Sequence, residues 1–293
     1  MIWVFPLLLP MIKVDLHSHS TISDGLMTPS ELVSHAASQG VQVLALTDHD
    51  DVAGIEEARA AAAHNGITLI AGTEISVTWR NRTLHILGLR IDPQHPILQQ
   101  GLTRVRESRF GRAQSIAQEL EKIGIQGSLE GARQFASEGI IGRTHFARFL
   151  IAQGHAKDMK TVFKRYLVKG KPGYVPHLWA SLEETLSWIL AAGGLPVIAH
   201  PGRYDLGRTL LNDLLSEFKS GGGAGLEVVS GSHHPEQYGQ LAELAQKYDL
   251  LASRGSDYHG PGHSYMSMGR LPDLPSQCRP LWHDWEEVRE HAA

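Results

Sequence analysis

Residues 14–19 read Val14-Asp15-Leu16-His17-Ser18-His19, a short strand pattern that ends in two histidines. In an extended chain, residues two apart point the same way, so the imidazoles of His17 and His19 can face one point. Histidine is the commonest metal ligand among side chains. A lone His-x-His is more often an ordinary strand pair, so the meaning of this stretch depends on the residues at the ends of the later strands.

The chain beyond this stretch alternates between strand and helix patterns. Thr28 and Glu31 form a capping box, with Pro29 in the first turn, that starts a helix, and Gly40 ends this helix. Apolar runs predict strands at residues 13–16, 41–46, 67–71, 74–79, 83–90, 195–199, 226–229 and 250–253, with 74–79 and 83–90 as a hairpin. Further helices are expected at 52–64, 209–219 and 235–248, and from the capping box at 181–184. Repeated βα units without a dinucleotide-binding glycine motif favour an α/β fold built as a parallel barrel.

A long helical segment interrupts this alternation. From about Leu102 to Lys171 the pattern is helical, charged and punctuated by glycines. We interpret it as an inserted helical subdomain. The predicted organisation is a first part of the barrel at 1–101, an insert at 102–174 that caps the substrate, and a second part of the barrel at 175–293.

Ionisable residues follow the predicted strands where a barrel would use them. Catalytic groups of a βα barrel collect at the carboxyl ends of its strands. Taken alone, each group has an ordinary alternative role: Asp48-His49-Asp50 as a solvated turn, Glu74 as a partner of Arg80, and His85 as a core histidine. Their occurrence at five strand ends together favours a metal site. The candidate ligands are His17, His19, Asp24, His49, Glu74, His85, His200, Asp257 and His259.

The composition narrows the kind of site. Cys278 is the only cysteine, which excludes a Cys-rich zinc site and an internal disulfide and is typical of the reducing cytoplasm. Imidazoles and carboxylates without thiolates suit zinc, manganese or iron. Nine candidates exceed the needs of one ion, so we expect two or three divalent ions that share a carboxylate, Glu74.

The hydropathy of the chain and its first ten residues bear on whether a membrane span or an export signal is expected. No run of about 18 apolar residues is present, so no membrane span is expected. The apolar residues 1–10 lack a basic leader and a small-residue cleavage site, so we do not expect them to act as a signal peptide. Translation can start at Met1 or at Met11.

The motif set as a whole resembles the PHP (polymerase and histidinol phosphatase) family. The resemblance covers nearly the whole chain and implies a distorted seven-stranded βα barrel with a site for two or three metal ions. All nine candidate ligands match the family pattern. The motifs that carry it are Asp15-Leu16-His17-Ser18-His19, Thr47-Asp48-His49-Asp50, Gly72-Thr73-Glu74, His200-Pro201-Gly202 and Gly255-Ser256-Asp257-Tyr258-His259.

Three further stretches, at 142–148, 169–176 and 200–204, are similar to one branch of that family. The branch contains 3′,5′-nucleoside bisphosphate phosphatases and 5′→3′ exoribonucleases. The resemblance implies hydrolysis of a phosphoester on the 3′ side of a 5′-phosphorylated nucleotide. The substrate would be a nucleoside 3′,5′-bisphosphate or short 5′-phosphorylated RNA, the product a nucleoside 5′-monophosphate, and manganese the favoured metal.

Basic side chains must supply the phosphate contacts, because the net charge of the chain is −4. Arg143, Arg203 and His145 are the candidates for neutralising phosphoryl charge. His145 is expected either to bind the 5′-phosphate or to protonate the leaving group. Lys169 and Lys171 are expected to line the cleft, whereas the arginines at 104–112 fit a solvated helix better than a nucleic-acid contact.

Two other functions compete with this interpretation. Another PHP phosphatase, such as one acting on histidinol phosphate, would need a pocket for an imidazole alcohol, and no motif marks one. A metal-loaded nucleic-acid-binding module without activity would be expected to have lost ligands, and none of the nine is missing. We expect no membrane association and no obligate protein partner.

Overall fold

The computed structural model describes residues 12–136, 141–289 and 291. Its sheet has the strand order β1-β2-β3-β4-β6-β7-β8, and β5 pairs with β3 beside this path. Hydrogen bonds from Leu16 N to Arg254 O and from Asp257 N to His17 O join the first strand to the last. The strands are β1 (Val14–Asp15), β2 (Val43–Leu46), β3 (Thr68–Trp79), β4 (Arg82–Leu89), β5 (Ala180–Ser181), β6 (Leu195–Ile198), β7 (Gly225–Ser230) and β8 (Leu251–Gly255). The result is the distorted, nearly closed seven-stranded βα barrel implied by the family resemblance.

The hairpin of β3 and β4 distorts the barrel. β4 pairs antiparallel with both β3 and β6, so the sheet is not wholly parallel. The two strands expected at 67–71 and 74–79 are one strand, so the expectation that Glu74 follows a strand end was wrong. Gly72 keeps β3 continuous, because a side chain there would collide with Thr47 and with the backbone of Leu46 and Gly88. Glu74 therefore points into the site from the middle of a long strand.

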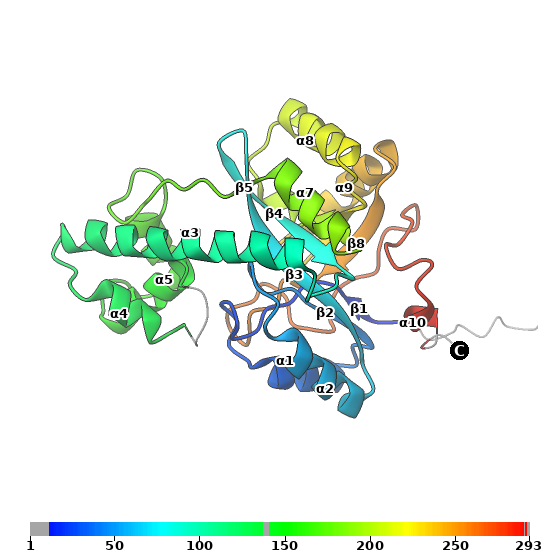
Figure 1. Cartoon of the computed structure of the whole chain (residues 1–293), viewed down its shortest axis with the longest axis horizontal. Helices are drawn as coiled ribbons and strands as arrows, with labels where there is room; N and C mark the ends of the chain where they lie inside the picture. Colours follow the sequence, from blue (N-terminus) through cyan, green and yellow to red (C-terminus); the bar gives the residue numbers. More distant parts are fainter. Residues whose placement is uncertain (1–11, 137–140, 290, 292–293) are drawn as a thin grey trace, which may run out of the picture.

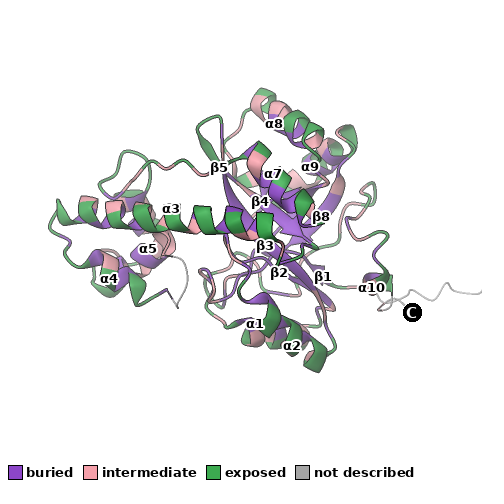
Figure 2. Ribbon diagram, viewed as in Figure 1, coloured by how far each residue is buried: buried purple, intermediate pink, exposed green. Residues whose placement is uncertain are grey.

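The barrel has an inner and an outer apolar layer. Alternate strand residues pack inside the barrel, where Val43, Ala45 and Ile70 join Trp285 near the C-terminus. Their neighbours pack outward against the covering helices (Figure 2). These helices are α1 (Pro29–Ser38), α2 (Ile55–Asn65), α7 (Leu182–Ala191), α8 (Arg208–Ser220) and α9 (Pro235–Lys247). Both predicted capping boxes are present, at Thr28–Glu31 and at Ser181–Glu184.

A helical lobe projects from one side of the barrel (Figure 1). Its elements are α3 (Pro96–Glu121), α4 (Ser128–Arg133), α5 (Arg143–Ala152), α6 (Met159–Val162) and the π-helical turn η1 (Phe163–Leu167). The lobe has an apolar core of its own, which includes Ile116, Leu120 and Phe146. α3 belongs to both parts, because Leu98 and Leu102 pack with the barrel core. The insert therefore shares its first helix with the barrel.

Two short helices complete the chain, η2 (Pro201–Arg203) after β6 and α10 (Glu286–Arg289) near the C-terminus. Residues 1–11, which include both candidate start sites, lie outside the described residues. Within the described part of the chain, every helix is too short or too polar to cross a membrane.

Candidate functional site

A cavity of about 1090 Å³ opens between the carboxyl ends of the strands and the helical lobe. Its lining includes Asp24, His49, Glu74, His85 and His259. The parallel strands of the barrel deliver their following loops to this end, which is why residues far apart in the sequence meet here.

Glu74 lies at the centre of the ligand candidates. Its side chain is fully buried. Oxygen Oε1 lies 2.8 Å from His85 and 2.9 Å from His200, and Oε2 lies 3.0 Å from His49. Two more imidazoles, those of His17 and His19, each lie 3.3 Å from Oε2. One carboxylate thus faces five imidazoles from four parts of the barrel.

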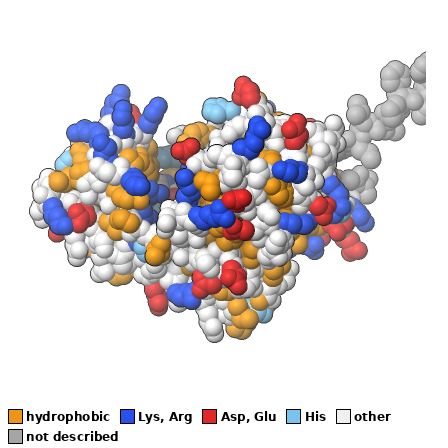
Figure 3. All heavy atoms as spheres, turned by 90° about the horizontal axis from the view of Figure 1, so that it is seen from above, with side chains coloured by type: hydrophobic (Ala, Val, Ile, Leu, Met, Phe, Trp, Pro, Cys, Tyr) orange, Lys and Arg blue, Asp and Glu red, His pale blue; other side chains and the backbone are white. Residues whose placement is uncertain are grey.

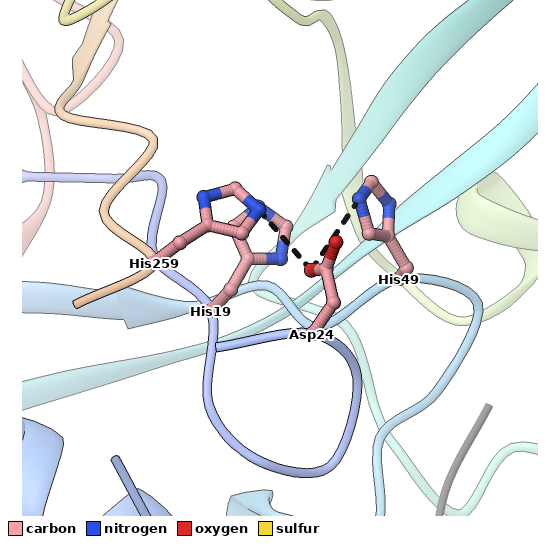
Figure 4. Close-up of side chains that lie close together, drawn as sticks. All are labelled: His19, Asp24, His49 and His259. Atoms are coloured by element: carbon pink, nitrogen blue, oxygen red, sulfur yellow. Dashed lines mark ion pairs between the residues drawn. The ribbon is translucent and has the colours of Figure 1, made fainter. Parts of the chain in front are cut away.

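The ligand candidates form three overlapping groups, in each of which the possible ligand atoms lie within 4.8 Å of one another. Figure 4 shows one group, with the Asp24 carboxylate between the imidazoles of His49 and His259. His200 joins the cluster through Glu74. The groups are His19, Asp24, His49 and His259; His17, His19, Glu74 and Asp257; and His49, Glu74 and His85. All nine residues singled out in the sequence therefore lie together.

The carboxylates of the cluster are held ionised. Burial opposes ionisation of Glu74, but the imidazoles of His85, His49 and His17 outweigh it and hold the pKa of this carboxyl well below its usual value. The same balance, chiefly against His259, lowers the pKa of Asp24.

The pKa values of two imidazoles in the cluster shift in opposite directions. Burial lowers the pKa of His49 well below its usual value. His259 is buried as well, but Asp24 outweighs the burial and raises its pKa to about 9. The cluster therefore attracts positive charge, as protons or as metal cations that displace them.

Several cluster atoms lack a hydrogen bond among the described residues, although Asp24 Oδ1 lies 3.1 Å from His259 Nε2. Among the described residues, Asp24 Oδ1, Glu74 Oε2, His49 Nδ1 and His200 Nδ1 are buried without a hydrogen bond. Glu74 Oε2 and His49 Nδ1 lie 3.0 Å apart but are not aligned for one. Buried polar atoms in native proteins are almost always satisfied, and divalent cations coordinate such oxygen and nitrogen lone pairs. The donor set therefore suits a site for several metal ions.

Backbone strain is concentrated at the same place. His200 and Asp257 have φ values of +29° and +55°, and Asp50 has +50°. Residues other than glycine rarely adopt this left-handed region, and such strain clusters at functional sites.

The predicted substrate-binding residues are divided between cavity and lobe. Arg143 and Arg203 line the cavity. His145 does not: it is buried, its Nδ1 accepts from the backbone N–H of Gly142 at 3.0 Å, and burial lowers its pKa to about 4. A neutral histidine that caps the start of α5 is badly placed to act on a substrate. The structure therefore places His145 outside the cavity lining, at the start of α5.

The lysines expected to line the cavity do not do so. Lys169 and Lys171 are exposed, in the turn that follows η1, and lie outside the lining. Lys160 and Lys164 line it instead, because they are four residues apart and lie on one side of a helical segment. Figure 3 shows Lys and Arg side chains gathered on this lobe.

Two arginines that the sequence favoured as solvated also line the cavity, Arg109 and Arg112. Both guanidinium groups lie over the ring of Trp179, at 4.7 and 5.4 Å. Burial, together with Arg143 and Arg109, lowers the pKa of Arg112 to about 10. Burial and Arg109 also lower the pKa of Arg143. Among the described residues, neither Arg112 nor Arg143 pairs with a carboxylate, so this wall of the cavity has uncompensated positive charge.

A family model for the PHP domain matches residues 15–230. The chain belongs to the PHP family. Among curated PHP relatives, a 3′,5′-nucleoside bisphosphate phosphatase of Chromobacterium violaceum is 50% identical over 94% of this chain and 97% of its own. The 5′-3′ exoribonuclease Rnm of Escherichia coli is 44% identical over 93% of this chain and 94% of its own.

Solved structures agree with the PHP assignment. An amidohydrolase from Chromobacterium violaceum, with bound sulfate and no metal, superposes with a TM-score of 0.89. It is 48% identical, and the match covers 95% of this chain and 96% of that one. A protein from Bifidobacterium adolescentis described as a metal-dependent phosphoesterase has a TM-score of 0.78 at 29% identity, over 96% of both chains.

An ion pair ties the insert to the PHP barrel. Asp50 accepts from Arg109 Nε at 2.5 Å and from the Ser76 backbone N–H at 2.7 Å, and its side chain is fully buried. Replacing Asp50 by Ala would leave the Arg109 charge buried without its partner. We expect Asp50→Ala to lower the free energy of unfolding by about 3–5 kcal/mol in urea denaturation. Glu56→Ala, which breaks the exposed pair with Arg59, should cost about 0.5 kcal/mol, and equal losses would contradict this role.

Proposed function

We propose that this chain is a metal-dependent phosphoesterase that hydrolyses the phosphoester on the 3′ side of a 5′-phosphorylated nucleotide. The observation that carries the proposal is that one cavity contains both the His and carboxylate cluster and the uncompensated arginines Arg112 and Arg143. The cluster can hold divalent cations, and these cations would bind the phosphate group that reacts. A separate cationic wall suits a second phosphate that stays intact.

The nine clustered residues would hold two or three divalent ions, for which manganese, zinc and iron are the candidates. When bound, such ions supply Lewis acidity to phosphoryl oxygens and activate water at neutral pH. The protein contributes the geometry. Glu74 lies at the centre of five imidazoles. Arg203 lines the cavity with its guanidinium group 3.0 Å from Asp257, where it would contact phosphoryl oxygens.

The cavity wall formed by Arg112 and Arg143 would bind the 5′-phosphate. Repulsion between the two guanidinium groups is relieved when a dianion lies between them, so binding gains more than from a solvated arginine. A phosphate at this position also holds the nucleotide in one orientation, which places its 3′ side toward the cluster. Orientation of this kind is a large part of catalysis in phosphoryl transfer.

One site of this kind can act on two substrates. In a nucleoside 3′,5′-bisphosphate the reacting group is a terminal phosphate, and in RNA it is the phosphodiester to the next nucleotide. The phosphorus attacked is the same, and both reactions release a nucleoside 5′-monophosphate. Residues 157–171 contain six Lys or Arg and one Asp, so the lobe beside the cavity mouth can attract the remainder of an RNA strand. The two curated relatives have these two activities.

The proposal is tested in the presence of manganese with three nucleotide substrates, and with histidinol phosphate as a fourth compound. We compare kcat/KM for a 5′-phosphorylated RNA, the same RNA with a 5′-hydroxyl, and adenosine 3′,5′-bisphosphate, and we identify products by chromatography. A charge-assisted contact of about 1.5–3 kcal/mol predicts about a 10- to 150-fold preference for the 5′-phosphorylated RNA. Equal rates on both RNAs would exclude recognition of the 5′-phosphate, and a preference for histidinol phosphate would favour the other PHP phosphatase.

A further inference from the structure

Glu227 is a fully buried carboxylate on β7, between the apolar residues Leu226 and Val228. It lies beneath the ligand cluster and outside the cavity lining. Its oxygen Oε1 is 3.1 Å from Nδ1 of His17, and Oε2 accepts from the backbone N–H of His200 at 2.6 Å. One carboxylate thus contacts two members of the cluster through different atoms.

The contact with His17 determines which ring nitrogen faces the cluster. A carboxylate beside Nδ1 keeps a proton on that nitrogen, which leaves Nε2 as the atom with a lone pair for a metal. Nε2 is the nitrogen that faces the site, 3.3 Å from Glu74 Oε2 and 3.5 Å from Asp257 Oδ1. Glu227 therefore orients the His17 ring and selects its tautomer.

The contact with His200 acts on the backbone. His200 has a φ of +29°, an unfavourable value for a residue with a side chain. The hydrogen bond from its N–H to Glu227 supports this conformation, in which Nε2 of His200 lies 2.9 Å from Glu74. Strained residues persist where the surrounding contacts hold them in place.

The contact between Glu227 and His17 leaves no room for a side chain at the neighbouring position 255. A side chain at Gly255 would overlap both His17 and Glu227 Oε1, so glycine is required there. Glu227 belongs to none of the three ligand groups found among the described residues. Because both of its oxygens already face N–H donors, it is suited to hold ligands rather than to be one.

We propose that Glu227 is a positioning residue that sets the metal affinity of the cluster through His17 and His200. The inference rests on the proposed metal site and concerns a residue outside it. A glutamine at this position has only one accepting oxygen for two N–H donors. Its NH2 group must therefore face an N–H donor with no acceptor between them, or His17 must change tautomer. In that other tautomer Nδ1 accepts from the amide and Nε2, the nitrogen that faces the cluster, carries the proton.

The test measures metal binding in the Glu227→Gln protein. Purified apoprotein is titrated with manganese, and the unbound ion is quantified by electron paramagnetic resonance. Loss of a carboxylate that supports a ligating histidine typically weakens metal binding about 10- to 100-fold, and we expect a weakening in that range. In the zinc-loaded wild-type protein, nuclear magnetic resonance should show a water-protected Nδ1–H proton on His17, which the variant should lack.

Ser253→Ala is the matched control. Ser253 is fully buried and lies opposite Glu227 in the β7–β8 pairing, and its hydroxyl makes no hydrogen bond within the described residues. Its removal should leave manganese affinity and the His17 proton unchanged. Equal manganese affinity in Glu227→Gln and wild type would overturn the proposal, as would an equal loss in Ser253→Ala.

A second variant keeps the proposal testable if the Glu227→Gln protein does not fold. If the Glu227→Gln apoprotein does not melt cooperatively, Glu227→Asp is used, because the shorter side chain retains the charge but cannot span both donors. It should show the same weakening, and wild-type affinity would overturn the inference. A wild-type protein that binds no manganese or zinc would instead refute the proposed function, so the two failures are distinguishable.

Discussion

Replacing Glu74 by Gln should reduce kcat by about a thousand-fold or more on every substrate. The amide keeps the shape of the side chain but removes the negative charge that faces the imidazoles of His17, His49 and His85. Metal-ion catalysis contributes several kcal/mol, and about 4 kcal/mol corresponds to a thousand-fold in rate. The measurement is steady-state turnover with saturating manganese, together with the bound metal per chain by atomic emission.

Glu31→Gln is the control for this change. Glu31 completes the exposed capping box of α1, and glutamine is also suited to that position. Its turnover and metal content should match the wild type. Turnover within tenfold of wild type in Glu74→Gln, with circular dichroism showing a folded barrel, would mean that the cluster is not the reaction centre.

Replacing Arg143 by Met should lower activity on 5′-phosphorylated RNA without lowering the stability of the fold. With the contact to the 5′-phosphate removed, kcat/KM for 5′-phosphorylated RNA should fall about 10- to 150-fold, corresponding to about 1.5–3 kcal/mol. The rate on the 5′-hydroxyl RNA should stay the same. The melting temperature should not fall, because the substitution removes a guanidinium that burial and neighbouring arginines disfavour.

A loss of activity without a loss of stability separates a binding role for Arg143 from a structural one. Arg133→Met, at an exposed arginine of α4 in the same lobe, is the matched control and should leave both readouts unchanged. A lower melting temperature for Arg143→Met with equal losses on both RNAs would show that Arg143 supports the fold of the insert. Loss of 5′-phosphate preference alone would support the proposed binding site.

Local sequence patterns predicted the elements of the barrel where local physics determines them. Capping boxes at Thr28 and Ser181 determine helix starts, because the bonds they form lie within one turn. The pattern failed around Gly72, because separate strands were expected at 67–71 and 74–79 where the structure has the single strand β3. The structure needs glycine there because neighbouring strands approach closely, and that approach depends on residues distant in the sequence, such as Thr47.

The basic residues of the insert were harder to predict for a similar reason. Arg109 and Arg112 have the spacing of a solvated helix face, and the sequence shows no difference between that face and a cavity wall. Their position against Trp179 depends on how α3 leaves the barrel. For Lys169 and Lys171 the sequence predicted a place in the cavity lining, and the structure puts both lysines outside it. The glycines near them indicate a turn, but they do not determine which side of the turn faces the cavity.

The sequence by itself determined the kind of fold and the set of ligand candidates, because strand alternation, capping boxes and the His and Asp motifs are all expressed within a few residues. The sequence also indicated Glu74 as the shared carboxylate, but only the tertiary structure decided that Glu74 reaches the cluster from the middle of β3 and that Glu227 lies behind His17. That contact joins residues 210 positions apart. A carboxylate within an apolar strand is the one signal that Glu227 shows in the sequence, and its meaning depends on which imidazole the closed barrel brings to it.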